Sequence, residues 1–343
     1  MKRPQTKWLY YITHIDNIPS ILRNGILSHE LIETRDIKYT RIYDKDIVAS
    51  RQQIYAPNGK SLWNFANLYF QPRNPMLYRV LHEKSEDEIA IVAVQPAVLQ
   101  RPDIYVSTGN AASPSSNILH AVEVNKALSQ IIRDTINVEW WNDADGSKRK
   151  IMAECLVPDL IPVDLIQSVY VASPKAQERV KASIAQSNLP IIPQPEMFFL
   201  PIQRFVLTPN LFLAKGDLFF SRMQTLTVSV NTVGVMGKGL ASRAKYQFPD
   251  VYVHYQDLCR SRKLQMGRPQ LYKREASLEH QLADDPSSLT NNNAEKWFLL
   301  FPTKRDWKER AYIGGIEEGL QWLAKNYNSE KIKSLAIPAL GCG

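Results

Sequence analysis

The sequence predicts an α+β domain followed by an α/β domain, and three observations lead to this division. The 343 residues exceed the length of one ordinary domain, which is about 100–200 residues. In the first part strand-like segments follow one another without regularly spaced helices, whereas strands and helices alternate in the second part. Between the two, four prolines interrupt regular structure over residues 189–203. We therefore expect domains at 1–199 and 200–343.

The first part begins with an apolar run at Trp8–Ile12 that predicts a strand. Residues 16–27 have the pattern of a short helix that Asp16 or Asn17 can cap and Gly25 can end. Further strands are expected at 88–96, 150–158 and 168–173, and a helix at 120–136.

The second part alternates strand and helix in chain order. Strands are expected at 226–232, 296–302 and 334–340, because these segments are apolar and of strand length. Helices are expected at 239–263 and at 313–327, where Ile316, Leu320, Leu323 and Tyr327 recur at helical spacing. The polar segment 275–295 predicts a surface loop. This order indicates a sheet with helices on its faces.

Composition excludes several protein classes. With 44% hydrophobic and 22% charged residues, the chain is typical of globular proteins, and it lacks an apolar run of the ~20 residues that a membrane span needs. Its basic start lacks the apolar stretch of a signal peptide. Cys155, Cys259 and Cys342 have the spacing of neither a disulfide framework nor a metal site. We therefore expect a cytoplasmic protein that binds neither a membrane nor a metal.

Basic residues concentrate in the second part. Residues 1–199 hold 22 Lys and Arg against 21 Asp and Glu, whereas residues 200–343 hold 20 against 13. Such an excess favours anionic partners such as phosphates or nucleic acid, although charge alone decides little.

The segment VNTVGVMGKGLA at 230–241 follows a predicted strand and opens a predicted helix. Its glycines let the backbone approach a ligand closely, while N–H groups at the helix start can bind phosphate. The spacing matches neither a P-loop nor a dinucleotide-binding turn. A glycine-rich turn that binds nothing has the same pattern, so the spacing leaves both interpretations open.

Four blocks of the second part closely resemble the macrodomain family, in particular the branch of the DarG antitoxins. The blocks are GDLF at 216–219, the glycine-rich segment, FPTKRDW at 301–307 and IPALGCG at 337–343. The resemblance implies a three-layer α/β/α fold that binds ADP-ribose, with Asp217 beside the adenine and Asn231 at the distal ribose. The other ADP-ribose-binding residues that it implies are Gly234, Val235, Met236, Gly237, Lys238, Gly239 and Gly341.

In that branch a lysine in the strand after the loop is catalytic, and Lys304 matches it. A lysine attacks the anomeric carbon of a ribose only as the uncharged amine, and nearby cations such as Arg305 and Lys308 favour that form. Without the resemblance, Lys304 would be an ordinary exposed lysine at a strand end. The family pattern continues beyond GCG with a second phosphate loop, so we expect a macrodomain that is incomplete at its C-terminus.

Glu154 stands out in the first part, because it shares a predicted strand face with Met152 and Leu156. A carboxylate among apolar neighbours is costly unless it is paired or used, which favours a functional role. His14 ends the first strand, where a core histidine is commoner than a ligand-binding one. Arg51, considered alone, is most simply a solvated surface charge.

Four blocks of the first part resemble the DarT family of DNA ADP-ribosyltransferases, over about residues 5–199. They are YITHIDNIPSILRNGI at 11–26, NLYFQPRNPMLY at 67–78, STGNAAS at 107–113 and RKIMAECLVP at 149–158. The resemblance implies an α+β ADP-ribosyltransferase fold that takes ADP-ribose from NAD, with Glu154 as the essential glutamate. Thr13, His14, Arg51 and Met76 would bind NAD. Arg51 would also serve catalysis, and Asn110 would lie in a loop on the substrate side.

Basic and aromatic residues precede Glu154 in the sequence. Lys148, Arg149 and Lys150 are candidates for phosphate contacts, and Trp140 is a candidate for base stacking. These two kinds of contact are typical of sites for single-stranded DNA. A solvated basic loop beside core tryptophans would produce the same sequence.

Together the resemblances imply a toxin and its antitoxin fused in one chain. The first domain would ADP-ribosylate thymidine in single-stranded DNA, where a base edge is accessible without unpairing. Glu154 would stabilise the positive charge that develops on the ribose as nicotinamide leaves. The second domain would bind ADP-ribose and remove it from DNA. Two alternatives stay open: an ADP-ribose reader with an inactive transferase half, or ADP-ribosylation of guanine or protein.

Overall fold

The computed structural model describes residues 7–42, 50–120, 130–131, 134–135, 138, 141, 145–274 and 296–342. The chain divides into two compact units, Met1–Gly216 and Asp217–Gly343. The division falls later than the expected boundary near residue 200, because residues 202–215 form a hairpin that is counted with the first unit. Most of the expected helix at 120–136, all of the expected loop at 275–295 and Trp140 lie outside the described residues.

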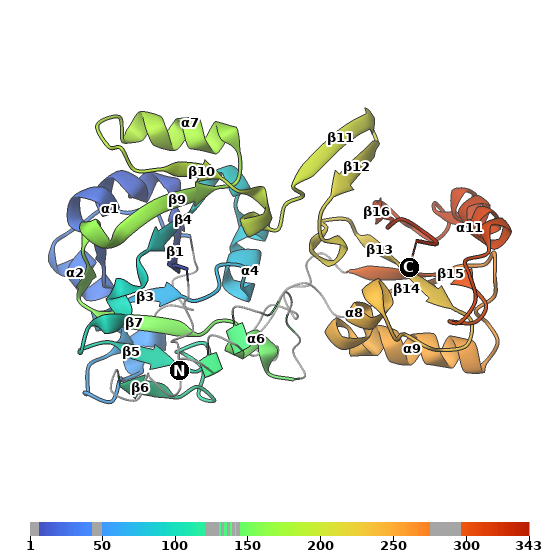
Figure 1. Cartoon of the computed structure of the whole chain (residues 1–343), viewed down its shortest axis with the longest axis horizontal. Coiled ribbons are helices and arrows are strands. Elements are labelled where there is room, and N and C mark those ends of the chain that lie inside the picture. Colours follow the sequence, from blue (N-terminus) through green and yellow to red (C-terminus); the bar gives the residue numbers. More distant parts are fainter. Residues whose placement is uncertain are drawn as a thin grey trace. The chain divides into compact units, whose positions relative to one another are not determined.

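The first unit contains an 8-stranded sheet in the order β10-β9-β4-β1-β3-β7-β5-β6 (Figure 1). Its neighbouring strands run antiparallel except for the parallel pair β9 and β10. The strands are β1 (Leu9–His14), β3 (Phe65–Tyr69), β4 (Ile89–Val94), β5 (Tyr105–Ser107), β6 (Ile118–His120), β7 (Glu154–Pro158), β9 (Ile166–Val171) and β10 (Ile191–Pro193). Two short strands, β2 (Ile26–Leu27) and β8 (Leu160–Ile161), pair separately.

Helices α1 (Ile18–Asn24) and α7 (Pro174–Ser183) cover one face of this sheet. Ile18 and Val180 from these helices share a core cluster with Leu9, Val92 and Cys155 of the sheet. Two-residue alternation along each strand places these side chains on one face and their chain neighbours on the other. The remaining described helices of this unit are α2 (His29–Thr34), α4 (Pro75–Glu83) and α6 (Ser147–Lys150).

Helix α1 ends where the sequence predicts, at Gly25, which has a φ of 80°. A Cβ atom at Gly25 would lie 2.4 Å from the carbonyl oxygen of Ile161. Glycine is therefore required both by the backbone conformation and by this close approach. Asn17 occupies the N-cap position of α1, but its side chain bonds to Thr13 and Thr40 instead of to the helix.

Two segments of the first unit differ from expectation. The strand expected at 150–158 begins only at Glu154, because the basic residues before it form the short helix α6. The proline-rich region contains β10 and a 3-10 turn at Pro195–Phe198. It is followed by a hairpin of β11 (Gln203–Thr208) and β12 (Leu211–Lys215), all of whose residues are exposed.

The second unit is a three-layer sandwich around a 4-stranded sheet of order β14-β15-β13-β16. Its strands are β13 (Thr225–Asn231), β14 (Gln270–Tyr272), β15 (Trp297–Lys304) and β16 (Leu335–Ala336), and β14 alone of these runs antiparallel to its neighbour. Alternate residues of β15 face opposite layers. Phe298 and Leu300 pack against α8 (Gly239–Gln247) and α9 (Pro249–Arg260), whereas Leu299 and Phe301 pack against α11 (Ile313–Asn326).

The expected helix at 239–263 is two helices, because the chain breaks at Phe248 before Pro249. A proline disfavours the helical conformation of the residue before it. The strand expected at 334–340 is confined to Leu335–Ala336. Among the described residues we find no helix both long and apolar enough to cross a membrane. The same residues contain no cluster of three His, Cys, Asp or Glu side chains suited to a metal.

Candidate active sites

Glu154 begins β7 and is completely buried. In the sheet register Glu154 pairs with Tyr69 of β3, and Tyr69 pairs with Tyr10 of β1. Paired residues on neighbouring strands point to the same face. The glutamate therefore lies on the face opposite the cluster that packs against α1 and α7.

Arg51 neutralises the buried carboxylate. Its Nη2 atom lies 2.9 Å from Oε2 of Glu154, and its Nη1 atom lies 3.3 Å from Oε1. The Arg51 side chain is itself only 13% exposed, and it comes from a 3-10 turn at Ser50–Gln53, far from β7 in sequence. Such a two-point pair fixes both the position and the rotation of the carboxylate. The two expected catalytic residues are thus brought together.

A loop that follows β5 supplies the third contact of Glu154. The backbone N–H of Ala111 donates to Oε1 at 2.9 Å. The Ser107 hydroxyl, at the end of β5, accepts the backbone N–H of Glu154 at 2.9 Å. Loop 107–117 therefore holds both the backbone and the side chain of the glutamate.

Arg149 holds this loop in place. Its Nη1 atom donates to the Ser116 hydroxyl at 3.0 Å, and its carbonyl accepts the N–H of Asn110 at 2.9 Å. A Cβ at Gly109 would lie 2.9 Å from that carbonyl oxygen. Glycine at this position thus lets Arg149 lie directly against the loop.

The remaining candidates for DNA contact occupy different environments. Lys148 is buried and Lys150 is exposed, so the basic triplet does not form one solvated face. Asn110 is also buried, and its side chain accepts the N–H of Ala112. Trp141 is buried against Tyr78, as in the alternative in which the tryptophans belong to the core.

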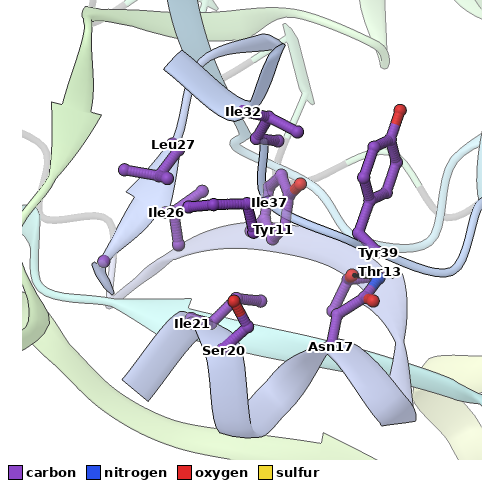
Figure 2. Close-up of a pocket in the computed structure, with 11 residues that line it drawn as sticks. Tyr11, Thr13, Asn17, Ser20, Ile21, Ile26, Leu27, Ile32, Ile37 and Tyr39 are labelled. Carbon is purple, nitrogen blue, oxygen red and sulfur yellow. Dashed lines mark hydrogen bonds between the residues drawn. The ribbon is translucent and has the colours of Figure 1, made fainter. Parts of the chain in front are cut away.

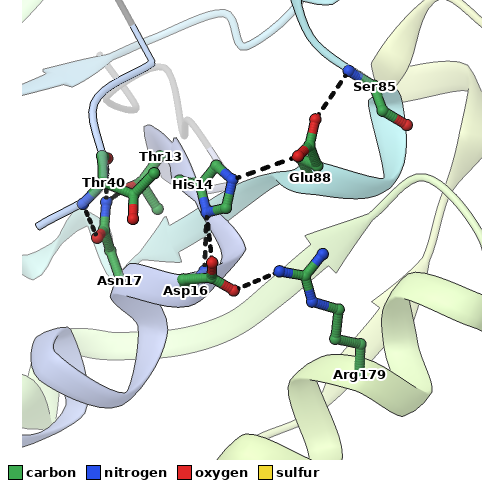
Figure 3. A network of polar contacts seen from close by, with 8 residues as sticks. All are labelled: Thr13, His14, Asp16, Asn17, Thr40, Ser85, Glu88 and Arg179. Carbon is green, nitrogen blue, oxygen red and sulfur yellow. Dashed lines mark hydrogen bonds and ion pairs between the residues drawn. The ribbon is translucent and has the colours of Figure 1, made fainter.

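His14 ends β1 in a polar network (Figure 3). Its Nδ1 atom accepts the backbone N–H of Asp16 at 3.1 Å, and its Nε2 atom lies 4.0 Å from Glu88. Asp16 in turn pairs with Arg179 at 2.6 Å. Burial is the largest influence on this ring and lowers the pKa of His14. A neutral ring with its proton on Nε2 satisfies both contacts.

Thr13 points to the other face of β1 and lines a pocket there (Figure 2). Its hydroxyl accepts a hydrogen bond from the Asn17 amide at 3.0 Å. Two tyrosines lie at the pocket walls, and the rest of the wall is largely aliphatic. The lining residues are Tyr11, Thr13, Asn17, Ser20, Ile21, Gly25, Ile26, Leu27, Ile32, Ile37 and Tyr39.

His29 lies near Tyr39 of this pocket and is influenced by the charge of Arg51, although the sequence pattern did not single it out. Burial and then the charge of Arg51 lower the pKa of His29 to about 4. The His29 ring stacks on Trp63 at 4.4 Å between centroids and lies 6.5 Å from the ring of Tyr39. No motif spacing marks His29 or Tyr39, so only the folded chain identifies them. Met76 lies half-buried in the first turn of α4.

In the second unit, Asn231 and Lys304 are register partners at the carboxyl ends of the parallel strands β13 and β15. Asn231 is buried and Lys304 is half-buried. Ligands of open α/β sheets bind at this edge. The backbone N–H of Thr232 bonds to the carbonyl of Arg305, which joins the two strand ends.

The glycine-rich loop follows β13 directly. Gly234 and Gly239 have φ values of 86° and 58°, a region that favours glycine. Met236 is buried in the core, so its side chain anchors the loop. The side chains at Val235 and Lys238 are exposed, as is Gly237. Met236 therefore anchors the loop, with exposed positions on both sides of it.

The two remaining candidates, Asp217 and Gly341, lie near the first and last residues of this unit in the sequence. Asp217 accepts the N–H of Phe219 at 3.0 Å and pairs with Arg243 at 2.7 Å, and it is partly buried. Gly341 has a φ of 82° and packs near Ala311. Asp217 therefore holds Arg243 as well as the turn, a role that the sequence did not indicate.

Comparisons with known proteins cover both units. A family profile described as "ssDNA thymidine ADP-ribosyltransferase, DarT" matches residues 10–199. A protein of Thermosipho africanus, described as a "DNA ADP-ribosyl transferase-DNA ADP-ribosyl glycohydrolase fusion protein", is 55% identical over 342 residues, 99% of this chain and 87% of that protein. A DNA ADP-ribosyl glycohydrolase of Thermus aquaticus is 33% identical over 129 residues, 38% of this chain and 32% of that protein.

A solved structure gives the same result for the fold. Thermosipho africanus DarTG in complex with ADP-ribose superposes with a TM-score of 0.92 at 53% sequence identity, covering 98% of this chain and 88% of that one. This likeness confirms both expected folds, the α+β fold of the first unit and the three-layer fold of the second.

Proposed function

Because the chain belongs to the DarT family of single-stranded DNA thymidine ADP-ribosyltransferases, we propose that Glu154 and Arg51 form its transferase centre and Lys304 its hydrolase centre. The chain is a DNA ADP-ribosyltransferase fused to a DNA ADP-ribosyl glycohydrolase macrodomain. The observation that carries the site assignment is the buried Arg51–Glu154 pair inside the segment that matches the family.

The transferase reaction uses NAD as the donor of ADP-ribose. When the bond between nicotinamide and ribose breaks, nicotinamide leaves with the bonding electrons and positive charge develops on the ribose. The Glu154 carboxylate stabilises this charge. It also accepts the proton that the attacking base nitrogen loses as it bonds to C1 of the ribose. The hydrogen bonds from Arg51 and from the Ala111 N–H fix the orientation of the carboxylate.

In this proposal NAD extends from the catalytic pair toward the end of β1, where Thr13 lines a pocket on the α1 face of the sheet and His14 points to the opposite face. The aliphatic and aromatic wall suits a planar ring of the dinucleotide, and hydroxyl and amide groups suit a ribose. Tyr39 lines the pocket, and His29, whose ring lies 6.5 Å from the Tyr39 ring, is influenced by the charge of Arg51. Thr13, His14, Arg51 and Met76 remain the proposed NAD-binding residues.

Single-stranded DNA approaches, in this proposal, along loop 107–117 and helix α6. The exposed Lys150 is suited to a phosphate contact. Asn110 shapes the loop beside Glu154, so it acts on the acceptor side of the centre. DNA and NAD meet in the cytoplasm of bacteria, which is where we propose that the protein acts.

The macrodomain site lies at the strand ends that carry Asn231 and Lys304. In this proposal the glycine-rich loop holds the pyrophosphate and the distal ribose, and the Lys304 amine attacks the ribose carbon that joins ADP-ribose to the base. The base leaves with the bonding electrons and takes up a proton, and water then releases ADP-ribose from the lysine.

Mass spectrometry of an oligonucleotide tests the transferase assignment. A thymine-containing single strand is incubated with NAD and the chain that carries Lys304→Ala, which stops reversal, with or without Glu154→Gln. An adduct of ADP-ribose on thymine that requires Glu154 supports the proposal. Guanine oligonucleotides and protein acceptors in parallel test the alternative acceptors. If no acceptor is modified while the chain still binds ADP-ribose, the chain is a reader with an inactive transferase half.

A further inference from the structure

Tyr255 of α9 is fully buried beneath the glycine-rich loop of the macrodomain unit. Its hydroxyl lies 2.8 Å from the side-chain oxygen of Asn231 and 3.0 Å from the Asn231 carbonyl. Burial, the largest influence on this phenol, raises the pKa of Tyr255. The hydroxyl therefore remains a proton donor across the physiological pH range.

The side-chain oxygen of Asn231 receives three donors. Besides Tyr255, the backbone N–H groups of Val233 and Val235 lie 3.1 and 3.2 Å away. The Asn231 amide nitrogen donates to the carbonyl of Val235 at 2.6 Å. These contacts distinguish the oxygen from the nitrogen, because a flipped amide would direct its N–H groups at the N–H groups of Val233 and Val235 and its oxygen at the Val235 carbonyl. The Tyr255 hydroxyl, which can donate or accept, holds the amide in place from the core side. The carboxamide thus has one permitted orientation.

This orientation has a chemical consequence for the strand ends. An amide nitrogen carries two N–H groups, and one of them bonds to Val235. The other N–H belongs to the register partner of Lys304, at the carboxyl end of β13. A donor at that place can bond a ribose hydroxyl of a ligand held against the strand ends.

We propose that Tyr255 is a positioning residue of the ADP-ribose site: its hydroxyl locks the Asn231 amide so that one N–H and the turn after β13 face the ribose beside Lys304. The inference rests on the proposed ADP-ribose binding of the second unit. Tyr255 touches no ligand and acts through Asn231.

Two tyrosines of α9 provide a matched pair of variants. Tyr255→Phe removes the hydroxyl that bonds Asn231 and keeps the ring. Tyr252→Phe, on the same helix, removes a hydroxyl whose partner is the Gln256 amide. Both variants are made in the full chain with Glu154→Gln, which stops the transferase reaction and leaves the same first unit in every variant, and ADP-ribose binding is measured by calorimetry. We expect Tyr255→Phe to weaken binding about fivefold, the worth of one hydrogen bond, and Tyr252→Phe to change it less than twofold.

A double-mutant cycle separates positioning from support of the fold. If Tyr255 acts through Asn231, Tyr255→Phe has no further effect on binding once Asn231→Ala is present. Equal effects in both backgrounds would overturn the inference, as would unchanged binding by Tyr255→Phe. If the parent chain binds no ADP-ribose, the proposed ADP-ribose binding of the second unit is wrong, and the inference about Tyr255 is wrong with it.

The melting temperature of Tyr255→Phe is compared with that of the parent to show that the variant folds. A second variant tests the inference without changing Tyr255. Asn231→Asp keeps an acceptor for Tyr255 and for the backbone N–H groups of Val233 and Val235 but lacks both amide N–H groups, including the one that bonds the Val235 carbonyl. We expect it to weaken binding at least as much as Asn231→Ala. Binding by Asn231→Asp as tight as that of the parent would overturn the role given to the amide N–H groups.

Discussion

Replacing Arg51 by methionine should destabilise the first unit strongly, because the change removes the positive charge that pairs with Glu154. Methionine keeps an unbranched apolar side chain at this position, so the loss of charge is the main change. Glu154 is completely buried, and two of its three side-chain contacts come from Arg51. Removing one member of a buried ion pair costs about 3–5 kcal/mol, since the other charge is left unpaired. The Ala111 N–H alone cannot replace a guanidinium.

Glu154→Gln in the same background should recover most of that stability. A neutral amide occupies the same volume and carries no charge to be solvated, so the double variant should lie within about 1–2 kcal/mol of the parent. Both variants should lose thymidine modification. The pair therefore separates stability, which the double variant regains, from activity, which it does not.

Hydrogen exchange in the native state measures the effect in the full chain. Amides of β4 and β7 are in the centre of the sheet, so their exchange reports the largest openings of this unit. Peptides that cover β13 and β15 of the second unit serve as the internal control. Protection of β7 in Arg51→Met within about 1 kcal/mol of the parent would refute the argument that the carboxylate depends on Arg51, as would failure of Glu154→Gln to restore protection.

Three further predictions concern His29 and the loop that holds Glu154. Burial and Arg51 lower the pKa of His29 from 6.5 to about 4. The stability that a neutral His29 contributes is therefore present above pH 6.5 and is lost as the pH falls toward 4, by at most about 3 kcal/mol at 1.4 kcal/mol per pH unit. In urea unfolding at pH 7 and pH 4.5, His29→Gln should lose less unfolding free energy between the two pH values than the parent does. Arg51→Met should raise the pKa of His29, measured by NMR titration, and an unchanged value would contradict their proximity. Arg149→Met should lower the turnover of DNA modification without changing the salt dependence of the oligonucleotide KM, because its guanidinium bonds Ser116 of the loop; a reduced salt slope would instead identify a phosphate contact.

Sequence patterns predicted the elements better than the contacts between them. The parallel strands of the second unit were predictable, because apolar runs alternate there with amphipathic helices, and this order also puts Asn231 and Lys304 at one sheet edge. The isolated carboxylate of Glu154 was visible among apolar neighbours. Its partner was not, since Arg51 follows no spacing rule and meets Glu154 only through the folded sheet. Only the family resemblance named both.

Local charge patterns did not show how the basic residues before Glu154 pack. Lys148 is buried, Lys150 is exposed and Arg149 bonds Ser116 of the loop after β5, while their contacts with DNA stay a prediction. The bond between Tyr255 and Asn231 is likewise a contact between two elements, and no sequence window contains it. Contacts between side chains of different elements depend on how the elements pack, and the pattern of a single sequence does not contain this information.

The order of the two units along the chain determines what a ribosome makes first. Every residue of the transferase centre lies within Met1–Gly216, and the segment that carries Asn231 and Lys304 starts only at Asp217. At translation rates of about 5–20 residues per second, and with N-terminal domains folding first, the second unit requires roughly 6–25 s more synthesis. We therefore expect each new molecule to pass through an interval in which its transferase unit has been made and its own macrodomain has not. ADP-ribose that this unit transfers in the interval would be removed by macrodomains of other chains.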